Sequence, residues 1–167
     1  MYKVDDLVVY GKNGVCRVVK IGTLEIPIAD SNKEYYTLRP IYQQEEIIYA
    51  PVDNCKITMR PIMSKTEARH LIDEMPDIDI IPFNNDRERE MQYKSVLQTC
   101  DCRELVRVIK DLYQRKEKRI LEGKKATVID ERYFKQAEEQ LYGELAYALE
   151  ISKDDVGTYI TECIKGK

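Results

Sequence analysis

The sequence predicts an α+β protein of two domains, a small antiparallel β-barrel of the SH3 or Tudor type over residues 1–62 and an all-α domain over residues 63–167. Five short β-rich runs within about 60 residues, without a long helical period, indicate the barrel. Five N-terminal capping signatures in succession indicate helices in the rest of the chain. One of these helices is strongly basic, although the whole chain has a net charge of −3.

The predicted barrel strands are short and bounded by turn residues. Residues 7–10 form the first strand, and the two glycines of residues 11–14 favour a tight turn over a phosphate-binding loop. Further β-rich runs cover residues 15–21, 35–41, 47–52 and 57–60. This half contains no histidine, no nucleophile elbow and no phosphate-cradling glycine loop. A barrel of this kind is typical of modules that bind a peptide or a protein edge.

The predicted helices each begin at a polar capping residue that is followed three positions later by an acidic residue. The five capping residues are Ser64, Asn85, Asp101, Thr127 and Ser152. Pro76 ends the first helix and Gly123 ends the third. Apolar residues at helical spacing form the predicted core, which comprises Ala68, Leu71, Ile72, Met75, Tyr93, Val96, Leu97, Leu105, Ile109, Leu112, Tyr113, Ile120, Phe134, Ala137, Leu141, Leu145, Ala148, Val156, Tyr159, Ile160 and Cys163.

The helix that begins at Asp101 carries the positive charge of the second half. Residues 103–125 contain nine basic and four acidic residues, a local charge of +5. At 3.6 residues per turn, four of the cations share a sector of about 80° opposite the apolar face. These four are Arg103, Arg107, Lys110 and Lys118. Such a stripe is either a solvated helix face or a surface that contacts phosphates.

Composition excludes several classes of protein. No apolar run approaches the roughly 20 residues that cross a bilayer, and the N-terminus lacks a signal region, so we expect a cytoplasmic protein without membrane contact. The five cysteines, at positions 16, 55, 100, 102 and 163, lack zinc-site spacing, and His70 is the sole histidine. We therefore expect reduced thiols and neither a metal nor a cofactor. Glu138, Glu139 and Glu144 are close in sequence and are predicted to form a solvated face.

A series of short motifs occurs in a specific order along the chain. The barrel opens with Lys-Val-Asp-Asp-Leu-Val-Val-Tyr at residues 3–10 and then Gly14, followed by Lys-Glu-Tyr-Tyr-Thr-Leu at residues 33–38 and by Pro51. The helical half contributes Tyr93-Lys94, the segment 105–113 and Gly-Glu-Leu-Ala at residues 143–146. This ordered set, which covers nearly the whole chain, resembles the CarD/CdnL family of bacterial transcription regulators.

The resemblance implies a regulator that binds RNA polymerase and is not an enzyme. The barrel is similar to the polymerase-interacting domain of the transcription-repair coupling factor, which implies docking on the polymerase β subunit. The residues that we expect at this contact are Leu24, Tyr35, Tyr36, Leu38, Tyr49 and Pro51. In relatives the helical domain touches promoter DNA near the upstream edge of the melted region and stabilises the open complex. We also expect a monomer, and the resemblance implies that polymerase associates it with the nucleoid.

The resemblance implies that the basic helix contacts the phosphates of DNA without reading its bases. The residues expected to contact DNA in this sequence-tolerant way are Phe83, Arg87, Arg89, Lys94, Arg103, Arg107, Lys110, Arg115, Lys118, Arg119, Lys124 and Lys125. A protein-protein adaptor that never touches DNA is the alternative. It predicts that neutralising the stripe of four cations leaves activity intact. An enzyme would need a nucleophile–base pair, which neither half supplies.

The chain departs from the family pattern at two points. Relatives place a tryptophan wedge near the start of a helix in the second half, and this chain has no tryptophan. Phe83 is our candidate for the wedge, with Arg89 as a minor-groove alternative. Phe83 could instead pack between the domains. Some relatives also grip polymerase with barrel arginines where this chain has Leu24 and Tyr49, which implies a more apolar contact or strand pairing along an exposed edge.

Overall fold

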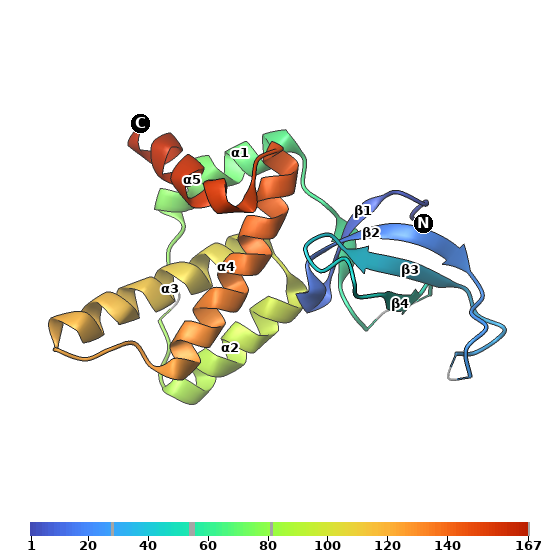
Figure 1. Cartoon of the computed structure of the whole chain (residues 1–167). Helices are drawn as coiled ribbons and strands as arrows, with labels where there is room; N and C mark the ends of the chain where they lie inside the picture. The colour runs from blue at the N-terminus through green and yellow to red at the C-terminus, as the bar shows by residue number, and fades with distance from the viewer. Residues whose placement is uncertain (28, 54–55, 81, 167) are drawn as a thin grey trace. The chain divides into compact units, whose positions relative to one another are not determined.

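The computed structural model describes residues 1–27, 29–53, 56–80 and 82–166, so Cys55 lies outside the described residues. The chain divides into two compact units, Met1–Ile62 and Met63–Lys167. The first unit holds the β-sheet and the second holds the α-helices (Figure 1). The predicted two-part α+β layout is therefore confirmed.

The first unit is an open antiparallel sheet and not the closed barrel that the sequence predicts. Its strands follow the order β4-β3-β2-β1-β5, and each adjacent pair is antiparallel. Among the described residues, β4 and β5 each pair with one neighbour, so the sheet keeps two edges. The strands differ from the predicted runs by only a few residues at their ends: β1 (Leu7–Tyr10), β2 (Val15–Gly22), β3 (Tyr35–Pro40), β4 (Ile48–Pro51) and β5 (Met59–Pro61).

One face of the sheet carries the core of this unit. Successive side chains of a strand point to opposite faces, so Tyr36 and Leu38 are buried while Tyr35 and Thr37 lie on the other face. Cys16 belongs to the same core, where burial, with a smaller effect of the Glu46 charge, raises the pKa of its thiol to about 12.

The turn after β1 requires glycine. Gly11 begins the short 3₁₀ helix η1 (Gly11–Asn13) with a φ of 48°, a value that favours glycine. A Cβ at this position would also lie 2.7 Å from Cγ2 of Ile57. The Gly11 amide donates a hydrogen bond of 2.8 Å to the carbonyl of Thr58, which fixes the turn against the segment before β5. Gly11 is thus a structural glycine, as the sequence predicts.

The helices of the second unit begin where the capping residues predict. Ser64 forms a complete capping box with Glu67, and Asn85, Asp101 and Thr127 each accept a hydrogen bond from a first-turn amide. Ser152 instead caps a 3₁₀ turn that leads into the last helix. The elements are α1 (Lys65–Glu74), η2 (Met75–Asp77), α2 (Asp86–Thr99), α3 (Cys102–Leu121), α4 (Val128–Leu149), η3 (Lys153–Asp155) and α5 (Val156–Lys165).

Helix α4 is the centre of the helical unit and packs against α1, α2, α3 and α5 (Figure 1). Most of the predicted core is confirmed, since nearly all of those side chains are buried or pack against the buried cluster. Tyr113 and Ile120 are the exceptions, because both are exposed. Tyr113 lies at the margin of the apolar face of α3, beside the buried Leu112, and Ile120 lies in the last turn of the helix.

Glu144 is also buried, so the prediction of a solvated carboxylate was wrong at this position. Its Oε2 accepts a hydrogen bond of 2.9 Å from the backbone amide of Met63, and its Oε1 accepts one of 3.1 Å from Sγ of Cys102. The carboxylate therefore joins the start of the helical unit to the first residue of α3 and to the middle of α4.

The residues that the structure describes include no helix that is both long and apolar enough to cross a membrane. Within the same residues, no three His, Cys, Asp or Glu side chains are grouped so that they could hold a metal ion.

Candidate functional site

Two cations in the first half of the basic stripe on α3 bond to neighbouring elements of the helical unit. Arg103 forms an ion pair with Glu74 at the end of α1. Lys110 donates a hydrogen bond of 2.7 Å from Nζ to the backbone carbonyl of Ile78, in the connector between α1 and α2. These contacts arise because α1 and the connector lie against the face of α3 to which the helical period assigns the cations. Both cations therefore help to fix α1 and its connector against α3.

Arg107 is engaged along α3 itself. Its Nη1 lies 3.4 Å from Oε1 of Glu104, one turn earlier, and the arginine is half-buried. Lys118, the last member of the stripe, is exposed. The solvated positive charge of α3 is thus concentrated toward the C-terminal end of the helix.

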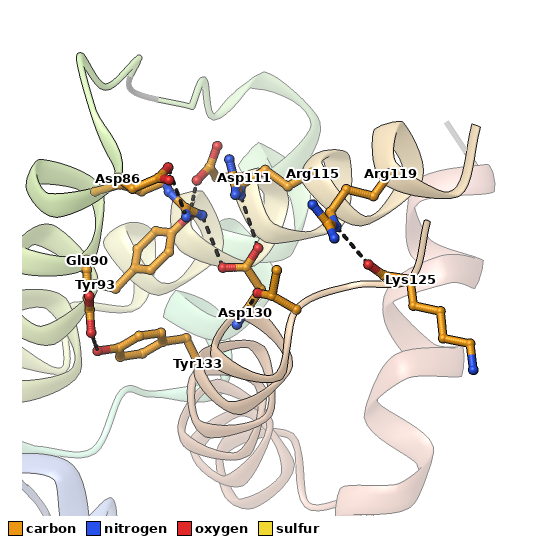
Figure 2. A network of polar contacts seen from close by, with 11 residues as sticks. Asp86, Glu90, Tyr93, Asp111, Arg115, Arg119, Lys125, Asp130 and Tyr133 are labelled. Atoms are coloured by element: carbon orange, nitrogen blue, oxygen red, sulfur yellow. Dashed lines mark hydrogen bonds and ion pairs between the residues drawn. The ribbon is translucent and has the colours of Figure 1, made fainter. Parts of the chain in front are cut away.

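Two of the predicted DNA-binding arginines meet at a single buried carboxylate. The Asp130 side chain, which is 8% exposed, lies in the first turn of α4. Its Oδ1 accepts a hydrogen bond of 3.2 Å from Nη1 of Arg89 on α2, and its Oδ2 accepts one of 3.2 Å from Nε of Arg115 on α3 (Figure 2). The Arg89 side chain is 11% exposed. This carboxylate ties three helices together and withdraws Arg89 from the surface.

Tyr93 extends the same network beneath Arg89. The Tyr93 hydroxyl donates a hydrogen bond to Asp111 of α3 and accepts one of 3.3 Å from Nη1 of Arg89 (Figure 2). Burial and the bond to Asp111 raise the pKa of Tyr93, so the hydroxyl stays protonated and remains a donor. The guanidinium carbon of Arg89 also lies 5.3 Å from the centre of the Tyr93 ring. The geometry thus gives Arg89 a structural role and leaves its predicted role in the minor groove without support.

Sequence reasoning missed this network. The sequence pattern predicts Asp130 only as the acidic residue of a helix cap, and the cap itself is present, since the Asp130 amide donates to Oγ1 of Thr127 at 3.1 Å. Nothing in the spacing of Arg89 and Arg115 indicates that they share a partner. The one available signal was a carboxylate on the side of α4 that carries core residues such as Tyr133 and Ala137.

Phe83 packs on the core of the helical unit. Its ring meets Tyr93 edge to face, with 6.2 Å between ring centres and an interplanar angle of 82°. The side chain is half-buried and lies two residues before the cap of α2. Its availability as a wedge for DNA stays a prediction.

Apart from Arg103, the exposed cations of the predicted DNA-binding set lie on α2 and at or after the end of α3. Arg87 and Lys94 are exposed on α2, where Nζ of Lys94 is 3.6 Å from Oε1 of Glu90. Lys124 and Lys125 are exposed in the turn between α3 and α4. Arg119 is half-buried, and its Nε donates a hydrogen bond of 2.7 Å to the Lys125 carbonyl (Figure 2). Arg119 therefore holds the turn that presents the two lysines.

In the first unit, the outer face of β3 and β4 is the candidate protein-binding surface. Tyr49 is 42% exposed on β4, and it lies opposite Thr37 in the pairing of the two strands. Tyr35 lies opposite Pro51 on the same face, and both are half-buried. Leu24, in the segment after β2, is also half-buried.

Two of the predicted polymerase-binding residues do not belong to this surface. Tyr36 and Leu38 point into the core, because they alternate with Tyr35 and Thr37 along β3. The motif therefore contributes its outward residues to a contact and its inward residues to the fold. Tyr42 and Ile47, which the sequence analysis passed over, are exposed in the segment that leads into β4. Both flank the polar run of residues 43–46, which is the signal that the sequence offers.

Comparison with known proteins identifies both units. Residues 2–63 match the family model of the CarD-like/TRCF RID domain, and residues 79–161 match that of the CarD, C-terminal domain. No curated protein matches the chain. The two domain matches occur in the order that the resemblance implies, so that resemblance is confirmed. The chain belongs to the CarD-like family, a family of transcription-associated proteins that interact with RNA polymerase.

Proposed function

We propose that this protein docks on the β subunit of RNA polymerase through the unit Met1–Ile62 and contacts promoter DNA through the unit Met63–Lys167, which stabilises the open complex. It acts as a monomer, in the cytoplasm, where polymerase associates it with the nucleoid. The match of both units to CarD-like domains, in order, is the observation that carries this proposal.

The β4 edge supports docking on a protein. A strand that pairs on one side offers its free backbone groups to a strand of a partner. Tyr49 adds an exposed aromatic ring on the outer face of this strand, and Ile47 adds an exposed aliphatic side chain just before it. Aromatic anchors are enriched at protein interfaces. The contact we propose is therefore apolar and uses the strand edge, with Tyr35 and Pro51 on the same face and a contribution from Leu24 in the segment after β2.

The distribution of exposed cations supports a DNA contact. Arg87, Lys94, Lys118, Lys124 and Lys125 are all exposed in the helical unit. Lysines of this kind contact phosphates, which position a protein on a duplex without reading its sequence. Binding that depends on phosphates releases counterions, so its affinity falls steeply as salt rises. The DNA contact we propose is correspondingly weak, sequence-tolerant and salt-dependent.

A protein adaptor without DNA contact is the second candidate, and one observation favours it. Arg103 and Lys110, half of the predicted stripe, bond to Glu74 and to the Ile78 carbonyl. The charge of α3 thus serves the fold in part. Neutralising the whole stripe would confuse loss of DNA binding with loss of structure, so the test must use the exposed lysines instead.

The test uses the full chain, purified polymerase and a promoter fragment. We expect the chain to bind polymerase, to crosslink to the β subunit through residues near β4, and to lengthen the lifetime of the open complex. Replacing Lys118, Lys124 and Lys125 with alanine should shorten that lifetime and leave polymerase affinity unchanged. A matched triple variant at the exposed Lys65, Lys135 and Lys165 is the control. Equal lifetimes for the two triple variants would favour the adaptor.

A further inference from the structure

The turn between α3 and α4 carries aliphatic side chains that the described residues of the helical unit leave largely exposed. We call residues 113–129 the α3–α4 tip. Leu121, the last residue of α3, is 87% exposed, and Val128, the first residue of α4, is 82% exposed. Ile120 and Ile129 are also exposed beside them. Four aliphatic side chains thus face solvent within ten consecutive residues of the chain.

One residue of this surface, Ile120, continues the core-facing stripe of α3, whereas Leu121 projects from the side of the basic stripe. At 100° per residue, Leu105, Leu112 and Ile120 fall within a sector of about 80°. The first two are buried and the third is exposed. Figure 1 shows the C-terminal end of α3 extending beyond the helices beside it. An apolar helix face of this kind is normally buried, so its uncovered end indicates a binding partner.

The tip has an ordered backbone. The amide of Gly123 bonds to the Ile120 carbonyl at 3.0 Å, and the amide of Lys124 bonds to the Arg119 carbonyl at 2.8 Å. Together with the Arg119 contact to the Lys125 carbonyl, these bonds fix the turn in place (Figure 2). The apolar side chains are therefore presented in a fixed geometry, and binding would not require the turn to become ordered.

The charge of the tip identifies the chemistry of its partner. The tip contains six basic and two acidic residues, a net charge of +4. Lys118, Lys124 and Lys125 are exposed next to the apolar side chains. The partner must be anionic and must also accept aliphatic side chains. DNA with unstacked bases meets both requirements, since apolar base faces become accessible beside phosphates.

We propose that the α3–α4 tip binds locally distorted or melted DNA, with Leu121 and Val128 packed against unstacked bases and Lys118, Lys124 and Lys125 on the flanking phosphates. This inference rests on the DNA contact proposed above and specifies the residues that prefer opened over paired DNA. Insertion of aliphatic side chains between base steps is a known way to hold a distorted duplex.

The test measures binding of the full chain to two DNA probes at low salt, a paired duplex and the same sequence with a short unpaired bubble. The wild-type chain should prefer the bubble. The double variant Leu121→Ser/Val128→Ser should lose about fivefold or more in bubble affinity and change little on the duplex. Val4→Ser, at an exposed valine of the first unit, is the control and should keep the preference. The single variant Leu121→Gln, which retains high helix propensity, should lose part of it without a change in melting temperature.

The outcomes separate the inference from the proposed function. Unchanged bubble affinity in both tip variants would overturn the inference and leave the general DNA contact standing. A loss of affinity for polymerase in the absence of DNA would assign the tip to a protein partner and would also overturn it. If the wild-type chain binds neither probe, the DNA contact itself fails.

Discussion

Arg89 on α2 and Asp130 on α4 form a buried ion pair, with Nη1 and Oδ1 separated by 3.2 Å and both side chains mostly covered. Arg115 approaches the other oxygen of the same carboxylate. Two guanidinium groups compensate the negative charge of the buried carboxylate, and the carboxylate in turn compensates the positive charge of each arginine. The pair is thus a structural tie among three helices.

Replacing Asp130 with alanine should destabilise the helical unit by about 3 kcal/mol, because Arg89 would remain buried with only the exposed Asp86 as a charged partner. Urea unfolding of the full chain measures this loss. Asp86→Ala is the matched control, since Asp86 also pairs with Arg89, at 3.4 Å, but its side chain is 86% exposed. The control should cost less than about 1 kcal/mol. Similar losses in the two variants would contradict the structural role of Asp130.

Lys110 and Lys118 lie on the same helix and should behave differently when replaced. Lys110→Ala removes the hydrogen bond to the Ile78 carbonyl and should cost about 1–2 kcal/mol of unfolding free energy. Lys118→Ala should leave stability unchanged and reduce the salt dependence of DNA binding by about one phosphate contact. Unfolding curves and a salt titration of DNA affinity distinguish them. The reverse assignment of effects would show that the stripe acts as one solvated face.

Tyr49 and Leu38 separate the binding face of the sheet from its core. Tyr49→Ala should lower polymerase affinity with little change in melting temperature, since the ring is on the outer face. Leu38→Ala should destabilise the first unit by about 2–5 kcal/mol, because its side chain is fully buried. Affinity measurements and thermal unfolding of both variants check this. Unchanged polymerase affinity for Tyr49→Ala would move the contact away from the β4 edge.

Phe83→Ala tests whether this ring serves the core or DNA. The ring packs against Tyr93, so its loss should cost about 2 kcal/mol of unfolding free energy. Phe83→Leu, which retains most of the apolar contact, should restore most of that stability. Thermal unfolding is measured beside the lifetime of the open complex. A shorter lifetime at unchanged stability would return Phe83 to the role of a wedge.

The buried thiol of Cys16 should make stability fall at alkaline pH. Burial raises its pKa from the ordinary value to about 12, so the unfolded chain loses this proton at a lower pH than the folded chain. The contribution is complete below about pH 9 and is lost as the pH rises toward 12. The free energy of unfolding should therefore decrease more steeply between pH 9 and 11 for the wild type than for Cys16→Ala. Parallel slopes would contradict this account.

Local sequence signals predict the elements of this fold well. The capping residues Ser64, Asn85, Asp101 and Thr127 begin helices as expected, because each cap is an interaction within one turn. Closure of the sheet was not predictable in the same way. Closure depends on whether β4 and β5 pair with each other. The alternation of apolar and polar residues along a single strand does not specify such a contact between separate strands.

The candidate site was harder to predict for the same reason. Charge and helical period locate the basic face of α3, but they do not reveal that the α1–α2 connector covers Lys110 or that Asp130 binds Arg89. Likewise, the period places Ile120 on the apolar face without showing where its cover ends. The partner of a long side chain is set by tertiary packing. The sequence therefore shows where the cationic residues are, but not which of them remain exposed to solvent.

The hydrogen bond between Glu144 and the Met63 amide joins residues that are 81 positions apart. The helical unit can therefore form this bond only after the chain as far as Glu144 has been synthesised. The sheet unit is complete by residue 62. During synthesis at about 5–20 residues per second, roughly 4 to 16 s pass between the two partners of this bond. The sheet can thus fold while α4 is still being made, and a nascent chain would acquire its complete sheet unit before its helical core closes.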